Sequence, residues 1–181
     1  LKRYTFAKSY LKEGDRVGDF ACGTGYGSAI LASKAGTVVG LDIDGRVINK
    51  IKERYKDISN LEFVESDLLN MNFENEFDTI VSFETIEHLK EEDILKLLGM
   101  YHKALKPAGR LIISTPYMQK NDRQALAGFH QTFFIDESKI NDWMDKSGFK
   151  IREFFYQSYG WPAVSKADVI KEFIVSIAEK V

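Results

Sequence analysis

The sequence has little of what disulfide-bonded, membrane-spanning or nucleic-acid-binding proteins need. Its single cysteine, Cys22, cannot form an internal disulfide. No apolar run approaches the roughly 20 residues that would cross a bilayer. The 25 basic residues are scattered among 27 acidic ones, with a formal net charge of -2, so no basic block is available for phosphate contacts. These absences predict a cytoplasmic protein without a membrane span and argue against nucleic acid as a substrate.

The length of 181 residues is enough for one domain and too small for two ordinary ones. A domain of this size buries roughly 70% of its unfolded surface, so its core needs no covalent staples. We therefore expect a single domain over residues 1–181. Because the first residue is Leu1 rather than Met, we also expect it to be trimmed or excised from a longer chain. The sequence does not predict an oligomeric state.

Two kinds of apolar pattern alternate along the chain. Short runs rich in β-branched residues are typical of buried strands, and the stretches between them repeat at helical spacing. This alternation predicts an α/β fold, a doubly wound and mostly parallel sheet with helices on both faces. The expected strands cover residues 16–21, 37–42, 61–66, 77–83, 110–115 and 149–157. The expected helices cover residues 1–12, about 27–35, 47–55 and 92–106.

Two later segments are less regular. Residues 116–134 show little periodicity, and we expect this long insertion to form a binding pocket, because extended loops in compact domains are often functional. The tail, residues 161–181, returns to helical spacing and predicts a helix rather than a seventh strand. Its spacing rests on Val169, Phe173, Ile174 and Ile177.

A glycine-rich loop follows the first expected strand. Gly23, Gly25 and Gly27 allow a tight turn and a close approach of the backbone to a ligand. Asp19, just before them, suits a cationic amino group. A dinucleotide site usually has the spacing GxGxxG and binds a pyrophosphate, but here Ser28 stands in the third glycine position and Asp19 would repel a phosphate. The loop therefore favours a cationic cofactor.

Acidic residues also follow the next two expected strands. Asp42 lies about where a Rossmann-type fold places the carboxylate that binds both ribose hydroxyls. Asp67 follows the third strand, where it could accept a hydrogen bond from the exocyclic amine of adenine. Both have an alternative interpretation as helix N-caps. The two positions suit any adenosine cofactor, so they do not show which of these cofactors binds.

Together these residues resemble the class I S-adenosylmethionine (SAM) dependent methyltransferase superfamily. Its glycine motif usually consists of an acid, two residues, Cys, Gly, any residue and Gly, and Asp19, Cys22, Gly23 and Gly25 match it. The resemblance covers about residues 3–155. It implies that SAM is the cofactor and S-adenosyl-L-homocysteine the product.

The resemblance also implies which residues contact the cofactor. Many members have glycine at the position of Ala21, and we expect alanine to be tolerated if its backbone stays in the β region. The implied contacts are Asp19, Ala21, Cys22, Gly23, Gly25, Asp42, Ile43, Asp67, Leu68 and Phe83. Arg3 and Tyr4 could close over the cofactor from the N-terminal helix, and ordinary packing is the alternative for both.

Within the superfamily, the chain looks closest to small-molecule and glycan methyltransferases. These carry a Glu-His-Leu motif after strand four, here residues 87–89, and a later segment like His130 with Phe133 and Phe134. Residues 82–85 read Ser-Phe-Glu-Thr rather than the Asn-Pro-Pro-Tyr type of tetrad found in enzymes that methylate amino groups of nucleic acids. This difference again argues against a nucleic-acid substrate.

Methyl transfer from a sulfonium requires an oriented acceptor and, for a hydroxyl acceptor, a base. Histidine is the natural base near neutral pH, and His88 and His130 are both candidates. We expect His88 to begin a helix just after strand four, where it could instead cap that helix or support the cofactor loop. The alternative for His130 is a packed core histidine. Glu84, the first residue beyond strand four, could face the methyl group or bind an acceptor hydroxyl, or be only a polar loop residue. His102 belongs to the helix of residues 92–106, and we expect it on a solvated face far from the site.

The long insertion is the expected acceptor pocket. His130 lies there between aromatic residues, and we expect Phe129, Phe133 and Phe134 to wall the pocket. No cluster of histidine, cysteine and acidic residues has the spacing of metal ligands, so we expect a reaction without metal.

These observations favour O-methylation of a sugar or another small hydroxylated metabolite, with a small-molecule or glycan acceptor. One alternative is a nicotinamide-dependent oxidoreductase on the same kind of sheet. Another is a SAM-binding domain without catalytic activity.

Overall fold

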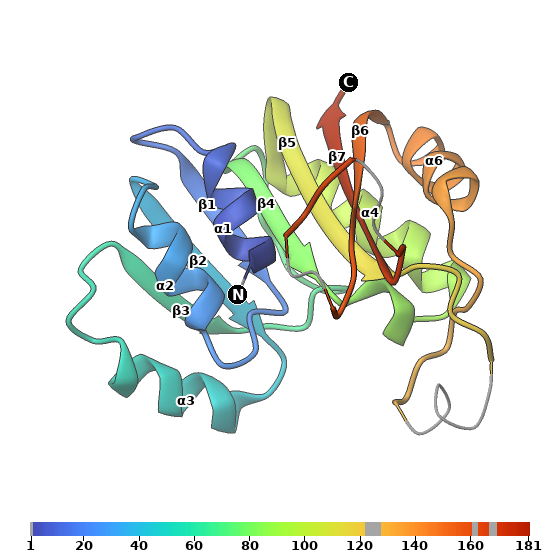
Figure 1. Ribbon diagram of the computed structural model, residues 1–181. Helices are drawn as coiled ribbons and strands as arrows, with labels where there is room; N and C mark the ends of the chain where they lie inside the picture. The colour runs from blue at the N-terminus through green and yellow to red at the C-terminus, as the bar shows by residue number, and fades with distance from the viewer. Residues whose placement is uncertain (1, 122–127, 161–162, 167–169) are drawn as a thin grey trace.

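Seven strands form one sheet in the computed structural model, which describes residues 2–121, 128–160, 163–166 and 170–181 (Figure 1). Their order is β3-β2-β1-β4-β5-β7-β6. The strands are β1 (Arg16–Phe20), β2 (Thr37–Asp42), β3 (Leu61–Glu65), β4 (Phe77–Phe83), β5 (Leu105–Pro116), β6 (Phe149–Gln157) and β7 (Phe173–Lys180). The helices are α1 (Lys2–Ser9), α2 (Tyr26–Ala32), α3 (Gly45–Arg54), the 3-10 helix η1 (Ile86–His88), α4 (Glu91–Ala104) and α6 (Glu137–Lys146).

The strand directions confirm the predicted doubly wound, mostly parallel sheet. Strands β1 to β5 pair in parallel, whereas β7 is antiparallel to both β5 and β6. From β1 the chain winds outward through β2 to β3, and then returns to β4 on the other side of β1. The carboxyl ends of β1 and β4 therefore form the switch point at which open α/β sheets bind ligands.

The prediction for the tail was wrong, because Phe173–Lys180 form strand β7 rather than a helix. The strand lies between β5 and β6, and its first six residues are buried. A strand that is covered on both faces lacks the alternation of apolar and polar residues by which strands are recognised. Phe173, Ile174 and Ile177 therefore also fit helical spacing. Val169, which completed that pattern, lies outside the described residues.

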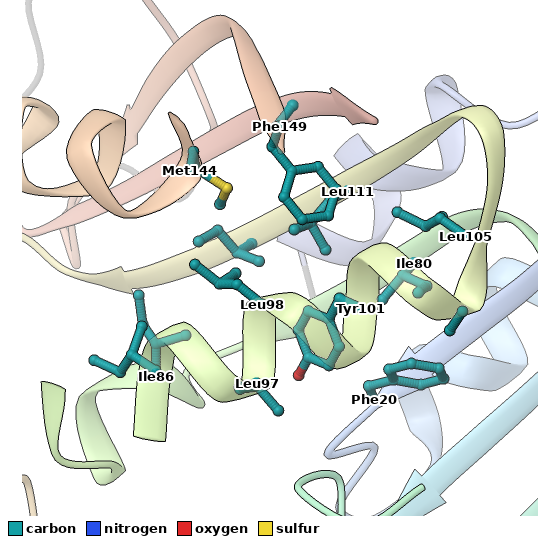
Figure 2. Close-up of a cluster of buried hydrophobic side chains, with 14 of the residues drawn as sticks. Phe20, Ile80, Ile86, Leu97, Leu98, Tyr101, Leu105, Leu111, Met144 and Phe149 are labelled. Carbon is teal, nitrogen blue, oxygen red and sulfur yellow. The ribbon is translucent and has the colours of Figure 1, made fainter. Parts of the chain in front are cut away.

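Helices cover both faces of the sheet, as predicted. On one face, α4 and α6 enclose a core that includes Phe20, Ile80 and Tyr101 (Figure 2). On the other face, α1 and α2 pack over Val81 and Ile112. Among the described helices, none is long and apolar enough to cross a membrane.

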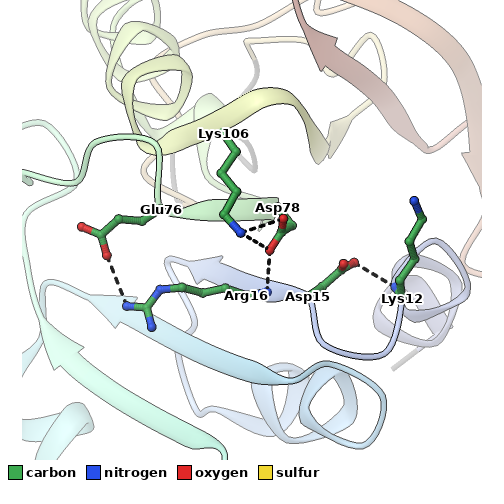
Figure 3. Close-up of polar contacts among 6 residues, drawn as sticks. All are labelled: Lys12, Asp15, Arg16, Glu76, Asp78 and Lys106. Atoms are coloured by element: carbon green, nitrogen blue, oxygen red, sulfur yellow. Dashed lines mark hydrogen bonds and ion pairs between the residues drawn. The ribbon is translucent and has the colours of Figure 1, made fainter.

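Charged residues join the entry ends of the central strands (Figure 3). The Lys106 ammonium contacts both carboxylate oxygens of Asp78, at 2.8 and 2.7 Å. Asp78 also accepts a hydrogen bond from the backbone N–H of Arg16 at 2.8 Å, and the Arg16 guanidinium pairs with Glu76. These contacts hold β1, β4 and β5 together at the edge opposite the carboxyl ends, so they stabilise the sheet away from the candidate site.

Candidate active site at the carboxyl edge of the sheet

The loop after β1 turns through left-handed backbone at alternate residues. Ala21, Gly23 and Gly25 have φ angles of 62°, 51° and 73°. A Cβ on Gly25 would lie only 2.8 Å from the Phe63 ring and 3.0 Å from the Tyr55 ring. With a φ of 62°, Ala21 is not in the β region, although we expected alanine to be tolerated at this position only in that region. An alanine in the left-handed region carries a steric cost that glycine avoids.

The carboxylate of Asp42 links this loop to the end of β2 through a hydrogen bond. Its Oδ2 accepts a hydrogen bond from the backbone N–H of Gly23 at 2.8 Å, and its Oδ1 accepts one from Asp44 at 3.0 Å. The N-cap of α3 is Asp44, whose side chain accepts from the backbone N–H groups of Arg46 and Val47. The alternative that Asp42 is the helix cap is therefore wrong. Each of its oxygens keeps a second lone pair for a ligand.

A first hollow of about 240 Å³ opens beside Asp42. Asp67 belongs to it, and this carboxylate accepts from the backbone N–H of Leu69 and the side chain of Asn70, so it closes a turn instead of capping a helix. The hollow is mostly apolar, which suits a flat heterocycle with few polar contacts. Its lining residues are Ala21, Asp42, Ile43, Ser66, Asp67, Leu68, Leu69, Glu84, Thr85, His88, Leu89 and Leu97.

A second hollow, of about 180 Å³, lies over the glycine loop. It is bounded by α1 on one side and by the end of β4 on the other. Its lining residues are Arg3, Tyr4, Ala21, Cys22, Gly23, Thr24, Tyr26, Phe83 and Glu84.

Asp19 lies fully buried behind the wall of the second hollow. Its Oδ1 accepts a hydrogen bond from the Tyr4 hydroxyl at 3.0 Å, and its Oδ2 accepts one from the Ser28 hydroxyl at 2.6 Å. Burial raises the pKa of Asp19 to about 6, although both hydroxyl groups favour the charged form. Tyr4, rather than Asp19, is the member of this pair that lines the hollow.

A third hollow, of about 570 Å³, opens between the ends of β5 and β7 and the segment before α6. The predicted aromatic wall was wrong, because none of Phe129, Phe133 and Phe134 lines this hollow, and Phe129 and Phe134 are exposed. Other aromatic residues take their place. The lining residues are Arg3, Glu84, Pro116, Tyr117, Gln119, His130, Tyr159, Lys171, Glu172 and Phe173. Residues 122–127 of the predicted insertion lie outside the described part of the chain.

Glu84 borders all three hollows. Its Oε1 accepts hydrogen bonds from Arg3 at 3.1 Å and from the Ser114 hydroxyl at 2.8 Å. Its φ of 53° is in the left-handed region, a strained conformation for glutamate that is typical of functional sites. Burial raises the pKa of the Glu84 carboxyl, and the charge of Arg3 opposes that rise.

The two candidate bases lie against each other. The rings of His88 and His130 have centroids 4.9 Å apart at an interplanar angle of 79°. His88 is the last residue of η1 and not the first residue of a helix, as we had expected. The pKa of His130 is lowered, first by burial and then by the charge of His88. His102 lines none of the three hollows, as expected, but the expected solvated face is wrong, because its ring packs against Phe149 at the start of β6 and its Nε2 atom is buried.

Known proteins identify the class of this domain. A family model described as a methyltransferase domain matches residues 17–109, slightly more than half of the chain. The chain belongs to this family. The enzyme class and the SAM cofactor are therefore those that the sequence predicted.

Individual relatives of this methyltransferase differ in what they methylate. A phosphoethanolamine N-methyltransferase from Plasmodium falciparum is 36% identical over 58% of this chain and 40% of its own length. A ubiquinone/menaquinone biosynthesis C-methyltransferase from Francisella tularensis is 31% identical over 62% of this chain and 47% of its own length. The methyltransferase thus spans less than half the length of these two curated relatives. A solved SAM-dependent methyltransferase from Methanosarcina mazei covers 100% of this chain and 99% of its own with a TM-score of 0.78 at 18% identity, which shows the shared fold.

The geometry of this methyltransferase fits SAM. Most of the expected cofactor contacts line the first or second hollow, which meet at Ala21 and Glu84. Gly25 does not line either hollow but permits the turn, and Asp19 lies behind Tyr4. On the acceptor side, Pro116, Tyr117, Gln119 and His130 come from the predicted insertion. Sequence reasoning missed the part that comes from β7 and the loop before it, namely Tyr159, Lys171, Glu172 and Phe173, and no motif in the sequence marks those four residues.

Proposed function

We propose that this domain transfers the methyl group of SAM to a hydroxyl of a sugar or another small polyhydroxylated metabolite. The adenosine would occupy the first hollow, with Asp42 on the ribose and Asp67 near the adenine. The methionine part would lie over the glycine loop in the second hollow, and the acceptor would bind in the third. The cytoplasmic location remains a prediction from composition.

The observation that carries this proposal is the position of Glu84. Its carboxylate borders the first, second and third hollows, so a cofactor that fills the first two would present its reactive end where the third begins. Reactions of this kind depend chiefly on orientation, which can supply on the order of 7 to 11 kcal/mol. Ion pairing with Arg3 and hydrogen bonding from Ser114 hold the Glu84 side chain in place at this junction.

Residues of the site can accept the proton that the acceptor hydroxyl loses in this reaction. When bound, SAM supplies an electrophilic methyl carbon on a sulfonium that leaves as the neutral thioether of S-adenosyl-L-homocysteine. An acceptor oxygen forms the new C–O bond with its lone pair as the C–S bond breaks, and its proton passes to an imidazole. His130 lines the acceptor hollow, and its lowered pKa keeps the ring neutral and able to accept a proton near pH 7. His88, beside it, lines the first hollow.

The charges around the third hollow favour a neutral acceptor. Arg3 is paired with Glu84, and Lys171 is bonded to Glu137 at 3.0 Å. Glu172 adds a further negative charge to the lining. An anionic acceptor such as a phosphate ester would have to compete for cations that already have partners. Tyrosine and phenylalanine rings beside these polar groups suit the mixed apolar and hydroxylated faces of a sugar.

An acceptor screen tests the proposal. The purified chain would be incubated with radiolabelled SAM and with sugars, glycans, small phenols, phosphoethanolamine and quinones. The proposal predicts label transfer to a hydroxylated acceptor and at least a 100-fold loss of turnover in His130→Ala, with SAM affinity retained because His130 lines only the acceptor hollow. His102→Ala is the matched control and should retain activity. Transfer only to an amine or carbon acceptor would overturn the O-methylation assignment, and SAM binding without transfer would favour a non-catalytic domain.

A further inference from the structure

A buried carboxylate lies beside the acceptor hollow. Glu87 is 1% exposed, and neither of its side-chain oxygens makes a hydrogen bond of normal length and angle among the described residues, although the Thr115 hydroxyl lies near enough to favour its charged form. A polar group buried in this way costs free energy unless a ligand, ion or water satisfies it. The proposed base chemistry does not use Glu87, so its burial needs a separate explanation.

Two imidazoles lie next to this carboxylate. One ligating atom each from Glu87, His88 and His130 can be chosen so that all three lie within 4.8 Å of one another. Nδ1 of His130 lies 2.6 Å from Oε1 of Gln119, an acceptor, so the hydrogen of this ring belongs on Nδ1 and the free lone pair on Nε2. Metal-binding histidines usually donate their other ring N–H to a carbonyl or carboxylate oxygen in this way, which fixes the tautomer.

Backbone contacts hold the cluster together although its parts are far apart in the sequence. The carbonyl oxygen of Glu87 accepts hydrogen bonds from the backbone N–H groups of Gln131 and Thr132, at 2.8 and 3.2 Å. The Gln131 side chain donates to the carbonyl oxygen of His88 at 2.7 Å, and the Thr132 hydroxyl donates to that of Leu89 at 2.6 Å. The segment that carries His130 is thus fixed to the segment that carries the other two groups.

We infer that Glu87, His88 and His130 bind one divalent transition-metal cation between the cofactor and acceptor hollows. Two imidazoles and one carboxylate are a ligand set that suits zinc, iron or manganese better than magnesium or calcium, which prefer oxygen ligands. Three protein ligands leave coordination positions open, as in catalytic metal sites. Zinc ligands lie about 3.3 Å apart in a tetrahedral site with bonds of about 2.0 Å, so the cluster must contract on binding.

The position of the cluster indicates a role in the proposed reaction. His88 lines the first hollow and His130 lines the third, so a cation held by both would lie where cofactor and acceptor meet. An acceptor hydroxyl at an open coordination position would lose its proton more readily, as metal-bound water does. The imidazoles would then hold the ion, and the proton would pass to solvent. This role rests on the proposed function, whereas metal binding by itself does not, and it would replace the expectation of a reaction without metal.

Metal binding is tested without turnover. The purified chain would be stripped with a chelator, dialysed, and titrated with cobalt(II) while its visible d–d absorption is recorded, and with zinc(II) by calorimetry. We expect one equivalent to bind. Glu87→Gln, His88→Ala and His130→Ala should each weaken binding at least 10-fold. Gln119→Leu, which removes the oxygen beside Nδ1 of His130, should weaken it by roughly 10- to 100-fold. His102→Ala should bind like the parent chain.

Two results would overturn the inference. One is no cobalt or zinc binding by the folded parent chain, and the other is binding that Glu87→Gln, His88→Ala and His130→Ala leave unchanged. Glu87→Gln keeps the shape of the side chain, and thermal unfolding of each variant checks that it is folded. Titration of the same stripped chain with SAM separates this inference from the proposed function. SAM binding and methyl transfer by a chain that binds no metal would refute the metal site alone.

Discussion

The Tyr4 hydroxyl donates a hydrogen bond to Oδ1 of Asp19 across 3.0 Å in the interior of the protein. This contact joins the N-terminal helix α1 to the end of β1 directly behind the glycine loop. A buried carboxylate without a cationic partner is costly when ionised, which is why the pKa of Asp19 is raised to about 6. Tyr4 separates Asp19 from the second hollow, so a cationic amino group of SAM bound there would reduce this cost only through its charge and not by direct contact.

The Asp19→Asn variant tests this cost through its pH dependence. The pKa of Asp19 in the folded chain, about 6, exceeds its ordinary value of 3.8, so the folded state binds the proton more tightly. The parent chain should therefore lose stability as pH rises from about 4 to about 6, and remain destabilised by on the order of 3 kcal/mol above that window. The variant lacks this loss. Urea unfolding of both chains at pH 4.5 and pH 7.5 should show its advantage growing with pH, and a difference that does not change with pH would contradict the assignment.

Ala21 and Gly23 form a matched pair for the strain in the glycine loop. Both have left-handed backbone, and a Cβ on Gly23 would meet nothing within 4 Å. Ala21→Gly should raise the free energy of unfolding by up to about 1 kcal/mol, whereas Gly23→Ala should lower it by about 1 kcal/mol or more. Denaturant midpoints measured without SAM check both signs. Shifts in the same direction would show that φ does not control stability here.

Glu84→Gln removes the charge at the junction of the three hollows while keeping an oxygen that Ser114 can donate to. If the carboxylate binds the acceptor hydroxyl, its loss should lower kcat/KM by roughly 10- to 100-fold, the usual value of a hydrogen bond to a charged group. Glu92→Gln, on the exposed side of α4, is the control. Steady-state kinetics with the acceptor found in the screen provide the measurement. Unchanged kcat/KM in Glu84→Gln would remove Glu84 from the site.

Sequence reasoning found the parts of the fold and site that depend on local pattern. The six predicted strands are present, and the residues around Asp42 and Asp67 line one hollow because parallel strands bring their carboxyl ends to one edge. Such positions follow from strand order alone.

The parts it missed depend on contacts between distant segments. Strand β7 was not predicted because it is buried on both faces and therefore lacks the alternation of apolar and polar residues. The cluster of Glu87, His88 and His130 exists because the backbone of Gln131 and Thr132 binds to that of Glu87, and no spacing in the sequence encodes such a contact. The left-handed backbone of Ala21 likewise follows from the path of the loop and not from residue type.

The central claim, that Asp42 and the hollow beside it hold SAM, is tested most directly by titrating the purified chain with SAM and with S-adenosyl-L-homocysteine by calorimetry. Asp42→Ala removes the carboxylate that holds Gly23 and faces the first hollow. Asp57→Ala, at an exposed position beyond α3, is the matched control. The account predicts micromolar binding of both ligands by the parent chain and the control, and at least a 10-fold loss in Asp42→Ala. A folded parent chain that binds neither ligand, or an Asp42→Ala variant that binds both as tightly as the parent does, would contradict it.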